Sequence, residues 1–271
     1  MPELPEVETT CRGLAPLVVG RRIEALDVRE PRLRWPVPPR LGARLAGRRI
    51  ESIGRRAKYL LFGTDAGTLL VHLGMSGGLR FHAHGAPPPG KHDHFDIRFA
   101  DGACLRYHDP RRFGSLHFTE QPERHPLIAG LGPEPLSDAF DAEYLAGACR
   151  GRRVAIKTHL MNARIVVGIG NIYANEALYR ARIHPARAAG RIARPRFDAL
   201  IDAIRNVLGD AIARGGTTLR DFAGSDGRPG YFQLDLDVYG REGEPCRRCG
   251  TPIRAVILGQ RSTYYCGRCQ R

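Results

Sequence analysis

The apolar positions near the start of the chain recur with the spacing of a helix. A separation of three or four residues joins Val7, Cys11, Leu14 and Val18, and it places them on one face of an α-helix over residues 6–19. The two prolines of this region fall before the helix or in its first turn, where proline is tolerated. We therefore expect one amphipathic helix at the amino end.

From about residue 22 to residue 120 the pattern changes to short runs typical of strands. In HFDIRF-ADGA-CLRYH, apolar and polar residues alternate around an Asp101-Gly102 turn, which predicts a β-hairpin. The segment TLLVHL, which begins at Thr68, is a continuous apolar run suited to a buried strand, and HAHGAPPPGKH has the composition of a loop. Many short strands with glycine turns indicate a sandwich or a barrel.

The second half of the chain becomes helical after a linker, PLIAGLGPEPLS, around residues 126–137. We predict four helices, which are SDAFDAEYLAGACR with Ser137 as its N-cap, a segment near 154–162, a segment through NIYANEALYRARI, and residues 195–214. The last of these has a clear apolar stripe and ends at Gly215-Gly216. A strand-rich half, a helical half and a small cysteine module follow one another, so we expect an α+β protein with several domains.

The cysteine module at the carboxyl end has the spacing of a metal site. Cys246-x2-Cys249 is followed by sixteen residues and then by Cys266-x2-Cys269, a four-thiolate zinc pattern. Disulfides are the alternative, but the chain has no secretory features and three further cysteines without an evident partner. With all four coordination positions filled by sulfur, the sequence predicts one structural zinc ion. The module is rich in arginine, which favours a nucleic-acid finger, with a protein-docking knuckle as the alternative.

Composition and charge narrow the class of protein. The chain has 271 residues, with 42 Lys+Arg against 28 Asp+Glu and a formal net charge of +14. Such a surplus points to a polyanionic partner, most often nucleic acid, although an arginine-rich proteome would also produce it. Because no long apolar run and no signal peptide are present, we expect a soluble cytoplasmic protein without a membrane segment. Only three of the basic residues are lysines, namely Lys58, Lys91 and Lys157.

The amino end is acidic in this basic chain and offers a reactive amine. Removal of Met1 before a small residue would leave Pro2 with a free secondary amine. An α-amino group of pKa about 7.7–8 has a far larger unprotonated, nucleophilic fraction at pH 7 than a lysine has. Attack of such an amine on a sugar carbon gives an iminium, which withdraws electrons for the next cleavage. Glu3 and Glu6 lie beside it. Taken alone, these residues are also ordinary helix-start chemistry.

Seven motifs in order give the chain a family resemblance. They are PELPEVETTCRGL, HLGMSGGLRFH, KHDHFDIRF, DPRRFG, VVGIGNIYANEALYRARIHP, SDGRPGYFQLDLDVYGREGEPC and the four-cysteine finger. Together they resemble the bacterial formamidopyrimidine-DNA glycosylases, which remove 8-oxoguanine and ring-opened purines from DNA. The resemblance implies a β-sandwich with an attached first helix, a helical helix–two-turn–helix domain and a zinc finger. It implies domains at 1–132, 133–234 and 235–271, with a lesion-capping loop at about 217–231.

The resemblance also implies catalytic roles. Pro2 would be the Schiff-base nucleophile at the sugar C1′, and Glu3, with Glu6 nearby, would move protons. Lys58 in RRAKYLL would take part in β-elimination. Arg261 in GQRSTYYC would act in δ-elimination, which we interpret as phosphate binding because a guanidinium is a poor proton donor.

Further residues match the DNA contacts of the family. Met75, Arg111 and Phe113 would fill the gap that a base leaves when it swings out of the duplex. Backbone contacts are implied for His72, His92, Arg152, Lys157, Asn171 and Tyr239. The histidines at 82, 84, 92 and 94 resemble a metal site, but we expect ordinary loop polarity. One departure from the family pattern is LMNAR before VVGIGN, because an acidic residue and an amide or base are expected after LM.

Two alternative functions remain. PELPE at the amino end and Met75 favour this family over the related endonuclease VIII type, which acts on oxidised pyrimidines. The second alternative is a non-catalytic binder of damaged DNA. We expect the partner to be damaged double-stranded DNA and the protein to be a monomer.

Overall fold

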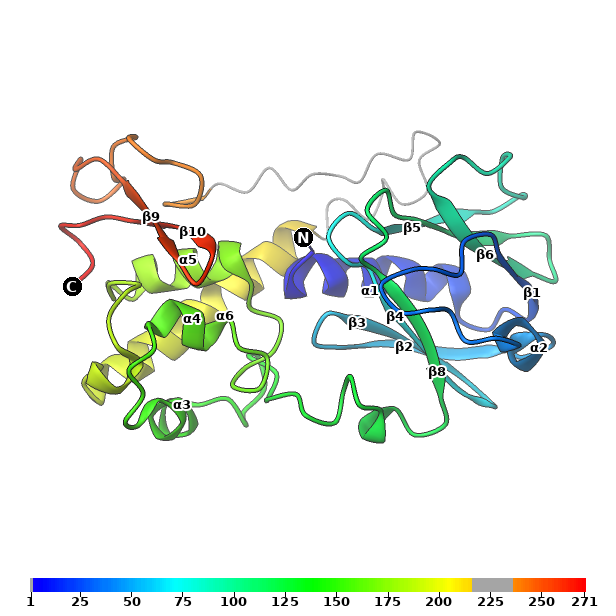
Figure 1. Cartoon of the computed structure of the whole chain (residues 1–271), viewed down its shortest axis with the longest axis horizontal. Helices are drawn as coiled ribbons and strands as arrows, with labels where there is room; N and C mark the ends of the chain where they lie inside the picture. The colour runs from blue at the N-terminus through cyan, green and yellow to red at the C-terminus, as the bar shows by residue number, and fades with distance from the viewer. Residues whose placement is uncertain (1, 216–235) are drawn as a thin grey trace. The chain divides into compact units, whose positions relative to one another are not determined.

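The computed structural model describes residues 2–215 and 236–271. The predicted lesion-capping loop lies outside the described residues. By its internal contacts the chain divides into two compact units, one formed by Met1–Ala129 with Ile212–Phe232 and the other by Gly130–Ala211 with Gln233–Arg271 (Figure 1). Within the described residues, no helix is long and apolar enough to cross a membrane.

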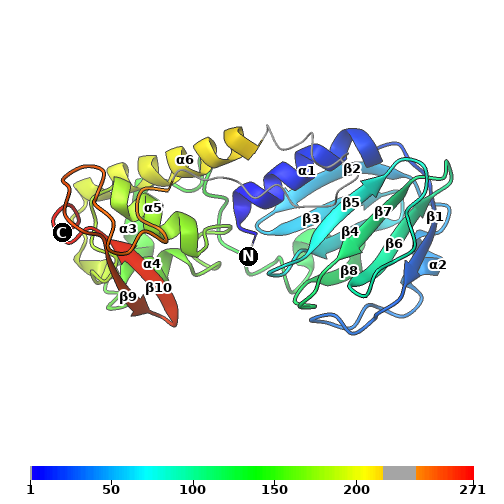
Figure 2. The same ribbon diagram turned by 90° about the horizontal axis from the view of Figure 1, so that it is seen from above.

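The first unit contains two four-stranded antiparallel sheets (Figure 2). One has the strand order β1-β6-β7-β5 and the other the order β2-β3-β4-β8. The strands are β1 (Ile23–Val28), β2 (Ile50–Arg56), β3 (Tyr59–Thr64), β4 (Gly67–His72), β5 (Gly78–His82), β6 (Asp93–Phe99), β7 (Cys104–His108) and β8 (Ser115–Thr119). Side chains of both sheets share one core, in which Phe62 and Leu69 lie with Phe95 and Leu105. The predicted sandwich and the hairpin around Asp101-Gly102 are therefore confirmed.

The first helix, α1 (Leu4–Val18), closes one side of this sandwich. It packs against β2, β3 and β5, and β2 and β5 are edge strands of different sheets. Its apolar face, which includes Leu4, Val7, Leu14 and Val18, is buried, as the periodicity predicts. The helix begins two residues earlier than expected because Pro5 occupies its first turn, where its missing N–H costs nothing. A second, five-residue helix, α2 (Leu41–Leu45), packs on β1 and was not predicted.

The second unit consists of helices and the cysteine hairpin. It contains α3 (Ala142–Cys149), α4 (Ile156–Leu160), α5 (Asn171–Arg180), most of α6 (Pro195–Gly215), β9 (Arg254–Leu258) and β10 (Arg261–Tyr265), with single 3-10 turns at Ala189–Arg191 here and Pro122–Arg124 in the first unit. The helices share a core that includes Leu160, Tyr173, Leu178, Leu200 and Ile204. Each of the four predicted helices is present, and α6 agrees with its predicted bounds to within one residue.

The start of α3 differs from the prediction. Ser137 is not its N-cap; the Ser137 hydroxyl donates instead to the carbonyl of Glu134 at 2.9 Å. The N-cap is Asp141, whose side chain accepts a 2.7 Å hydrogen bond from the backbone N–H of Tyr144. Serine and aspartate are both good caps, but the helix begins after Asp141 and not after Ser137.

Candidate functional site

The first turn of α1 holds the acidic residues of the amino end. Glu3 is the N-cap of the helix and only 2% exposed. The Glu6 carboxylate accepts a 2.7 Å hydrogen bond from the backbone N–H of Glu3, which is one half of a capping box. Half-buried Pro2 directly precedes them. Glu6 thus fixes the backbone at Glu3, and the Glu3 carboxyl is shielded from bulk water beside the proline.

Lys58 lies at the tip of a tight hairpin. Arg56 pairs with Tyr59, so Ala57 and Lys58 form a two-residue turn between β2 and β3. Ala57 has φ of 53°, as the first position of the common hairpin turns requires. The side chain of Arg55 braces this turn by donating to the carbonyl of Ala57 at 2.9 Å.

The same arginine ties the hairpin to α1. Arg55 Nε donates to the Glu8 carboxylate at 2.8 Å, and Arg12 donates to the other oxygen at 2.7 Å. Burial alone would raise the pKa of Glu8, but the hydrogen bonds and charges of Arg55 and Arg12 outweigh it and hold that pKa below its usual value. Glu8 is therefore ionised at neutral pH. The turn that carries Lys58 is consequently held against the helix that begins at Glu3.

His72, at the end of β4, is a neutral imidazole in this structure. Burial, and then the positive charges of Lys58 and Arg34, lower its pKa to about 4. Its Nδ1 accepts a 2.9 Å hydrogen bond from the Gly74 backbone N–H, which leaves the proton on Nε2. The ring lies 4.8 Å from that of Tyr59, its partner across the sheet. A contact from His72 to a DNA phosphate would be a neutral hydrogen bond and not an ion pair.

Two loops carry the residues expected to enter the duplex, which we call the wedge residues: Met75, Arg111 and Phe113. Met75 lies in the turn between β4 and β5 and is half-buried, whereas Phe113 is 41% exposed. The guanidinium of Arg111 lies 4.8 Å from the centre of the Phe113 ring, a cation–π arrangement. A planar ring and a planar cation are thus stacked at the surface.

In the second unit, two predicted phosphate contacts converge on the strand that begins at Arg261. Lys157 Nζ donates to the carbonyl of Ser262 at 3.0 Å and to the hydroxyl of Thr263 at 2.6 Å. Asn171 Nδ2 also donates to Ser262, at 3.0 Å. Lys157 is 0% exposed, so here it holds the finger hairpin. Asn171 opens α5, and exposed Arg261 begins β10.

A residue that the sequence analysis missed anchors the segment leading to the finger. Glu176, on α5, accepts hydrogen bonds from the backbone N–H groups of Asp237, Val238 and Tyr239 at 2.8, 3.0 and 2.9 Å. Burial raises the pKa of Glu176, and the three bonds offset this only in part. The anchor fixes Tyr239, whose ring meets that of Tyr264 edge-on at 5.2 Å. In the sequence Glu176 is indistinguishable from an acid on a solvated helix face.

The remaining predicted contacts are at the surface or nearly so. His92 is half-buried, with its ring 5.9 Å from that of His108, and Arg152 is exposed. In the LMNAR segment, Asn162 Oδ1 accepts a 3.0 Å hydrogen bond from the Arg164 backbone N–H. An acidic side chain would make the same bond, so the departure from the family pattern keeps this turn.

The four cysteines of the finger lie close enough to hold one metal ion. Their sulfur atoms all lie within 4.8 Å of one another. Cys246 and Cys269 are 3.9 Å apart, and Cys249 and Cys266 are 3.5 Å apart. Tetrahedral zinc with Zn–S bonds of about 2.3 Å needs sulfur separations of about 3.8 Å. The set fits a structural zinc ion, with a further contact of 3.3 Å between Cys246 Sγ and the hydroxyl of Tyr179.

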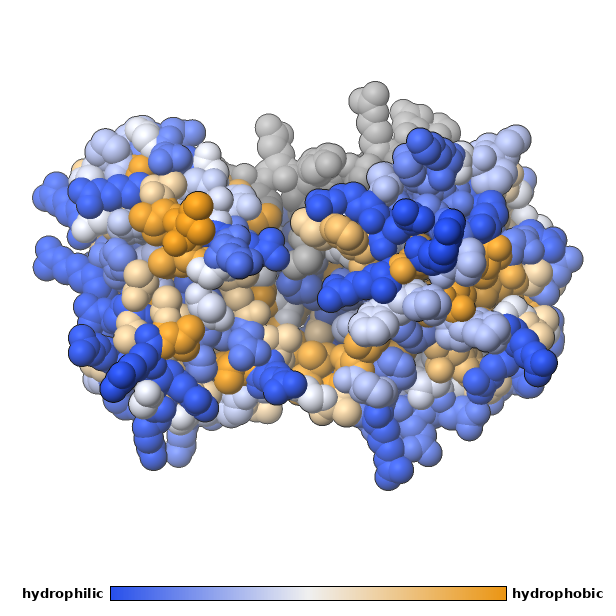
Figure 3. All heavy atoms as spheres, viewed as in Figure 1, coloured by the Kyte–Doolittle hydropathy of each residue, from blue (hydrophilic) through white to orange (hydrophobic). Residues whose placement is uncertain are grey.

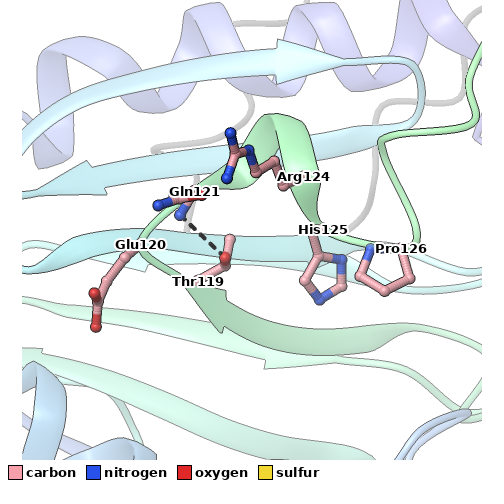
Figure 4. A pocket seen from close by; sticks show the side chains of 6 residues that line it. All are labelled: Thr119, Glu120, Gln121, Arg124, His125 and Pro126. Atoms are coloured by element: carbon pink, nitrogen blue, oxygen red, sulfur yellow. Dashed lines mark hydrogen bonds between the residues drawn. The ribbon is translucent and has the colours of Figure 1, made fainter.

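Two surface hollows formed by the described residues are lined by none of the predicted catalytic residues. One of roughly 330 Å³ lies at the end of β8 and is lined by Thr119, Glu120, Gln121, Arg124, His125 and Pro126 (Figure 4). Another, of roughly 510 Å³, lies beside the finger cysteines and is lined by five arginines, at 182, 196, 248, 268 and 271. Hydrophilic side chains cover most of the face drawn in Figure 3.

Comparison with family models accounts for most of the chain. The N-terminal domain of formamidopyrimidine-DNA glycosylase matches residues 1–116, and the H2TH domain of the same enzyme matches residues 131–223. A zinc finger found in FPG and IleRS matches residues 243–271.

Whole proteins and solved structures agree with these models. Curated formamidopyrimidine-DNA glycosylases of Alkalilimnicola ehrlichii and Methylococcus capsulatus are 59% and 60% identical to the chain, and both alignments cover 100% of each sequence. The Lactococcus lactis Fpg complex with Fapy-dG-containing DNA is 36% identical with a TM-score of 0.88, covering 99% of this chain and 100% of that one. MutM (FPG) from Thermus thermophilus is 41% identical with a TM-score of 0.85, covering 99% and 98%.

Proposed function

The chain belongs to the formamidopyrimidine-DNA glycosylase family, and from this we propose that it removes 8-oxoguanine and formamidopyrimidines from duplex DNA and then cleaves the strand. It is a DNA glycosylase of base-excision repair with a structural zinc ion. Similar structures were solved with DNA that contains an abasic site, Fapy-dG or carbocyclic 8-oxo-G. The observation that carries the proposal is the buried Glu3 carboxyl beside Pro2, on a helix tied to the Lys58 hairpin.

In the proposed mechanism, the amine of Pro2 attacks C1′ of the damaged nucleotide. The bond from C1′ to the base breaks, and Glu3, shielded from bulk water, moves the protons that opening of the sugar and departure of the base require. The resulting iminium makes the C2′ proton acidic. Its removal expels the 3′ phosphate, and Lys58 assists this β-elimination. Arg261 binds phosphate during the second, δ-elimination step.

The contacts to DNA follow from the same arrangement. The wedge residues enter the duplex as the damaged base swings out, because an apolar side chain and a stacked ring replace lost base stacking. Asn171 and the N-terminus of α5 offer donors to a backbone phosphate. His72 contributes a neutral N–H, and Lys157 acts by holding the finger hairpin in place. His92, Arg152 and Tyr239 make peripheral backbone contacts.

The organisation of the chain completes the proposal. The domains are 1–132, 133–234 and 235–271, and the enzyme works as a monomer in the cytoplasm. Matches of the family models to the first 116 residues and to residues 131–223 support the first two domains.

Covalent trapping with borohydride tests the nucleophile. We expect the protein with a free Pro2 amine to be trapped on a duplex that contains 8-oxoguanine opposite cytosine, and peptide mapping to place the link on Pro2. Acetylation of that amine should abolish trapping while DNA affinity stays within a few-fold, since phosphate contacts dominate affinity.

Three results would refute parts of the proposal. Trapping that survives acetylation would show that another residue is the nucleophile. Faster excision of thymine glycol than of 8-oxoguanine would assign the endonuclease VIII preference. Tight binding of the lesion duplex without excision by the free-amine protein would support a non-catalytic binder.

A further inference from the structure

A buried carboxylate, Asp109, joins the two loops that carry the wedge residues. It is 0% exposed, and each of its oxygens accepts two hydrogen bonds. Oδ1 accepts from the hydroxyl of Ser76 at 2.7 Å and from the backbone N–H of Arg111 at 3.2 Å. Oδ2 accepts from the hydroxyl of Tyr107 at 3.0 Å and from the backbone N–H of Gly114 at 2.9 Å. Because a carboxylate has about four acceptor positions, this one is fully used.

Three of the four donors to Asp109 come from the two loops, the fourth is the Tyr107 hydroxyl of β7, and all four are neutral. Ser76 directly follows Met75, and the two backbone N–H groups belong to the loop of Arg111 and Phe113. Among the described residues, which are 2–215 and 236–271, no lysine or arginine forms an ion pair with Asp109 within 4.0 Å. Burial, with the charge of Asp109 next, raises the pKa of the Tyr107 hydroxyl, so that the hydroxyl keeps its proton and can donate it.

The backbones of the two loops also touch directly. A Cβ atom on Gly74, which has φ of +71°, would overlap the backbone nitrogen of Gly114. A Cβ atom on Gly114 would overlap the Tyr107 hydroxyl and would lie 2.5 Å from the carbonyl oxygen of His72. Cβ atoms in proteins essentially never approach non-bonded atoms so closely, so only glycine fits at either position. The loops are therefore packed as one body around the carboxylate.

We propose that Asp109, acting through Ser76, is a positioning residue that makes the three wedge residues enter DNA as one unit. The inference rests on the proposed role of the wedge residues. A buried carboxylate without a cation is expensive, and a neutral side chain would hold one loop at lower cost. Four acceptor positions allow one side chain to hold both loops. Two loops ordered in advance lose less conformational entropy when they insert than two independent ones.

The variant Ser76→Ala tests this coupling. Ser76 is exposed, so its loss should leave the fold intact, whereas a change at Asp109 would also disturb the loop backbone. We expect single-turnover excision of 8-oxoguanine opposite cytosine to slow by about tenfold, the value of one hydrogen bond to a charged group. Cleavage of a duplex with a preformed abasic site should stay within about twofold, because no base must be unstacked there.

Control variants separate coupling from general damage. Ser76→Thr keeps the hydroxyl and should restore the excision rate. Ser52→Ala, at an exposed serine of β2, should have no effect. A 2-aminopurine next to the lesion should report slower insertion of the wedge residues in Ser76→Ala alone.

Further outcomes separate a failure of the coupling through Asp109 from a failure of the wedge role itself. If Ser76→Ala slows excision and abasic-site cleavage equally, or if Ser76→Thr does not restore the rate, the coupling is refuted. The same holds if Met75→Ala and Phe113→Ala slow excision but Ser76→Ala does not, and the proposed function then stands. If Met75→Ala and Phe113→Ala also leave excision unchanged, the wedge role itself fails, and the coupling fails with it.

Discussion

Replacing Arg55 with methionine should both destabilise the protein and slow catalysis. Methionine keeps the apolar stem of the side chain but removes the hydrogen bonds to Glu8 at 2.8 Å and to the carbonyl of Ala57 at 2.9 Å. Arg55 and Glu8 are only 12% and 19% exposed, so the bonds are largely shielded from water. At about 1.5–3 kcal/mol for a hydrogen bond to a charged group, and with Arg12 still next to Glu8, we expect a loss of about 2–4 kcal/mol.

The catalytic effect follows from the position of Lys58 at the tip of the braced turn. A displacement of about 1 Å can cost about a hundredfold in rate, so we expect single-turnover excision by Arg55→Met to fall by about 10- to 100-fold. Arg55→Lys retains a cation for Glu8, but its single ammonium is a poor substitute for the two separate donors. It should recover much of the stability and little of the rate.

Urea unfolding and single-turnover excision measure the two effects separately. The pKa of Glu8 is lowered in the folded protein, so its ion pair stabilises the fold above the unfolded pKa of about 4.3 and is lost as the pH falls through the folded value. The stability difference between wild type and Arg55→Met should therefore be full at pH 7 and shrink below about pH 4.

The matched control is Arg98→Met. Arg98 also pairs with two carboxylates, those of Glu24 and Asp27, but all three side chains are about half exposed. Its loss removes the same charge and should cost less than about 1 kcal/mol. The positioning argument is refuted if Arg55→Met excises at the wild-type rate, or if Arg98→Met slows excision equally.

Two further outcomes follow from the buried charges and from the finger. Asp96 accepts paired hydrogen bonds from both Arg29 and Arg106. Burial raises its pKa, but the arginines outweigh this and lower it to about 2. Asp96→Asn should lower the free energy of unfolding by about 3–5 kcal/mol, measured with urea at pH 7. About 2–3 kcal/mol of this difference between wild type and variant should disappear as the pH falls from about 4 towards 2. An unchanged free energy of unfolding at pH 7 would contradict the prediction. Removal of zinc by a chelator, or the variant Cys266→Ser, should lower the zinc content from about one ion per chain, as metal analysis would show. It should also weaken binding to the lesion duplex, measured by titration. Full DNA affinity without zinc would show that the finger does not bind DNA.

Local patterns predict those parts of the fold in which the signal and the structure involve neighbouring residues. The alternation around Asp101-Gly102 predicts the β6–β7 hairpin, and the paired Cys-x2-Cys spacing predicts the sulfur cluster. The start of α3 was missed because Ser137 and Asp141 both have cap chemistry, and the cap hydrogen bond forms at Asp141. The five-residue helix α2 is too short for a periodic signal.

For the candidate site, the sequence predicts the types of residue but not their protonation or burial. A sequence shows that His72 and Lys157 are bases, but not that one is neutral and the other is fully buried. Both facts depend on residues distant in the chain, such as Arg34 for the histidine and Ser262 for the lysine. In the sequence, Asp109 looks like a turn residue before proline. Its partner, the hydroxyl of Ser76, is 33 positions away, so no local pattern reveals the pair.

Three acidic residues of this basic chain serve the same structural purpose next to residues of the candidate site. Glu6 accepts from the backbone of Glu3, Asp109 from the loop of the wedge residues, and Glu176 from three consecutive N–H groups at 237–239. Backbone donors in such segments have no strand or helix partner, and a carboxylate can accept several at once, whereas arginine accepts none. Because these carboxylates face backbone donors and not solvent, they add little repulsion towards phosphate. The acids thus shape a surface whose net charge of +14 attracts DNA, and further arginine could not replace them.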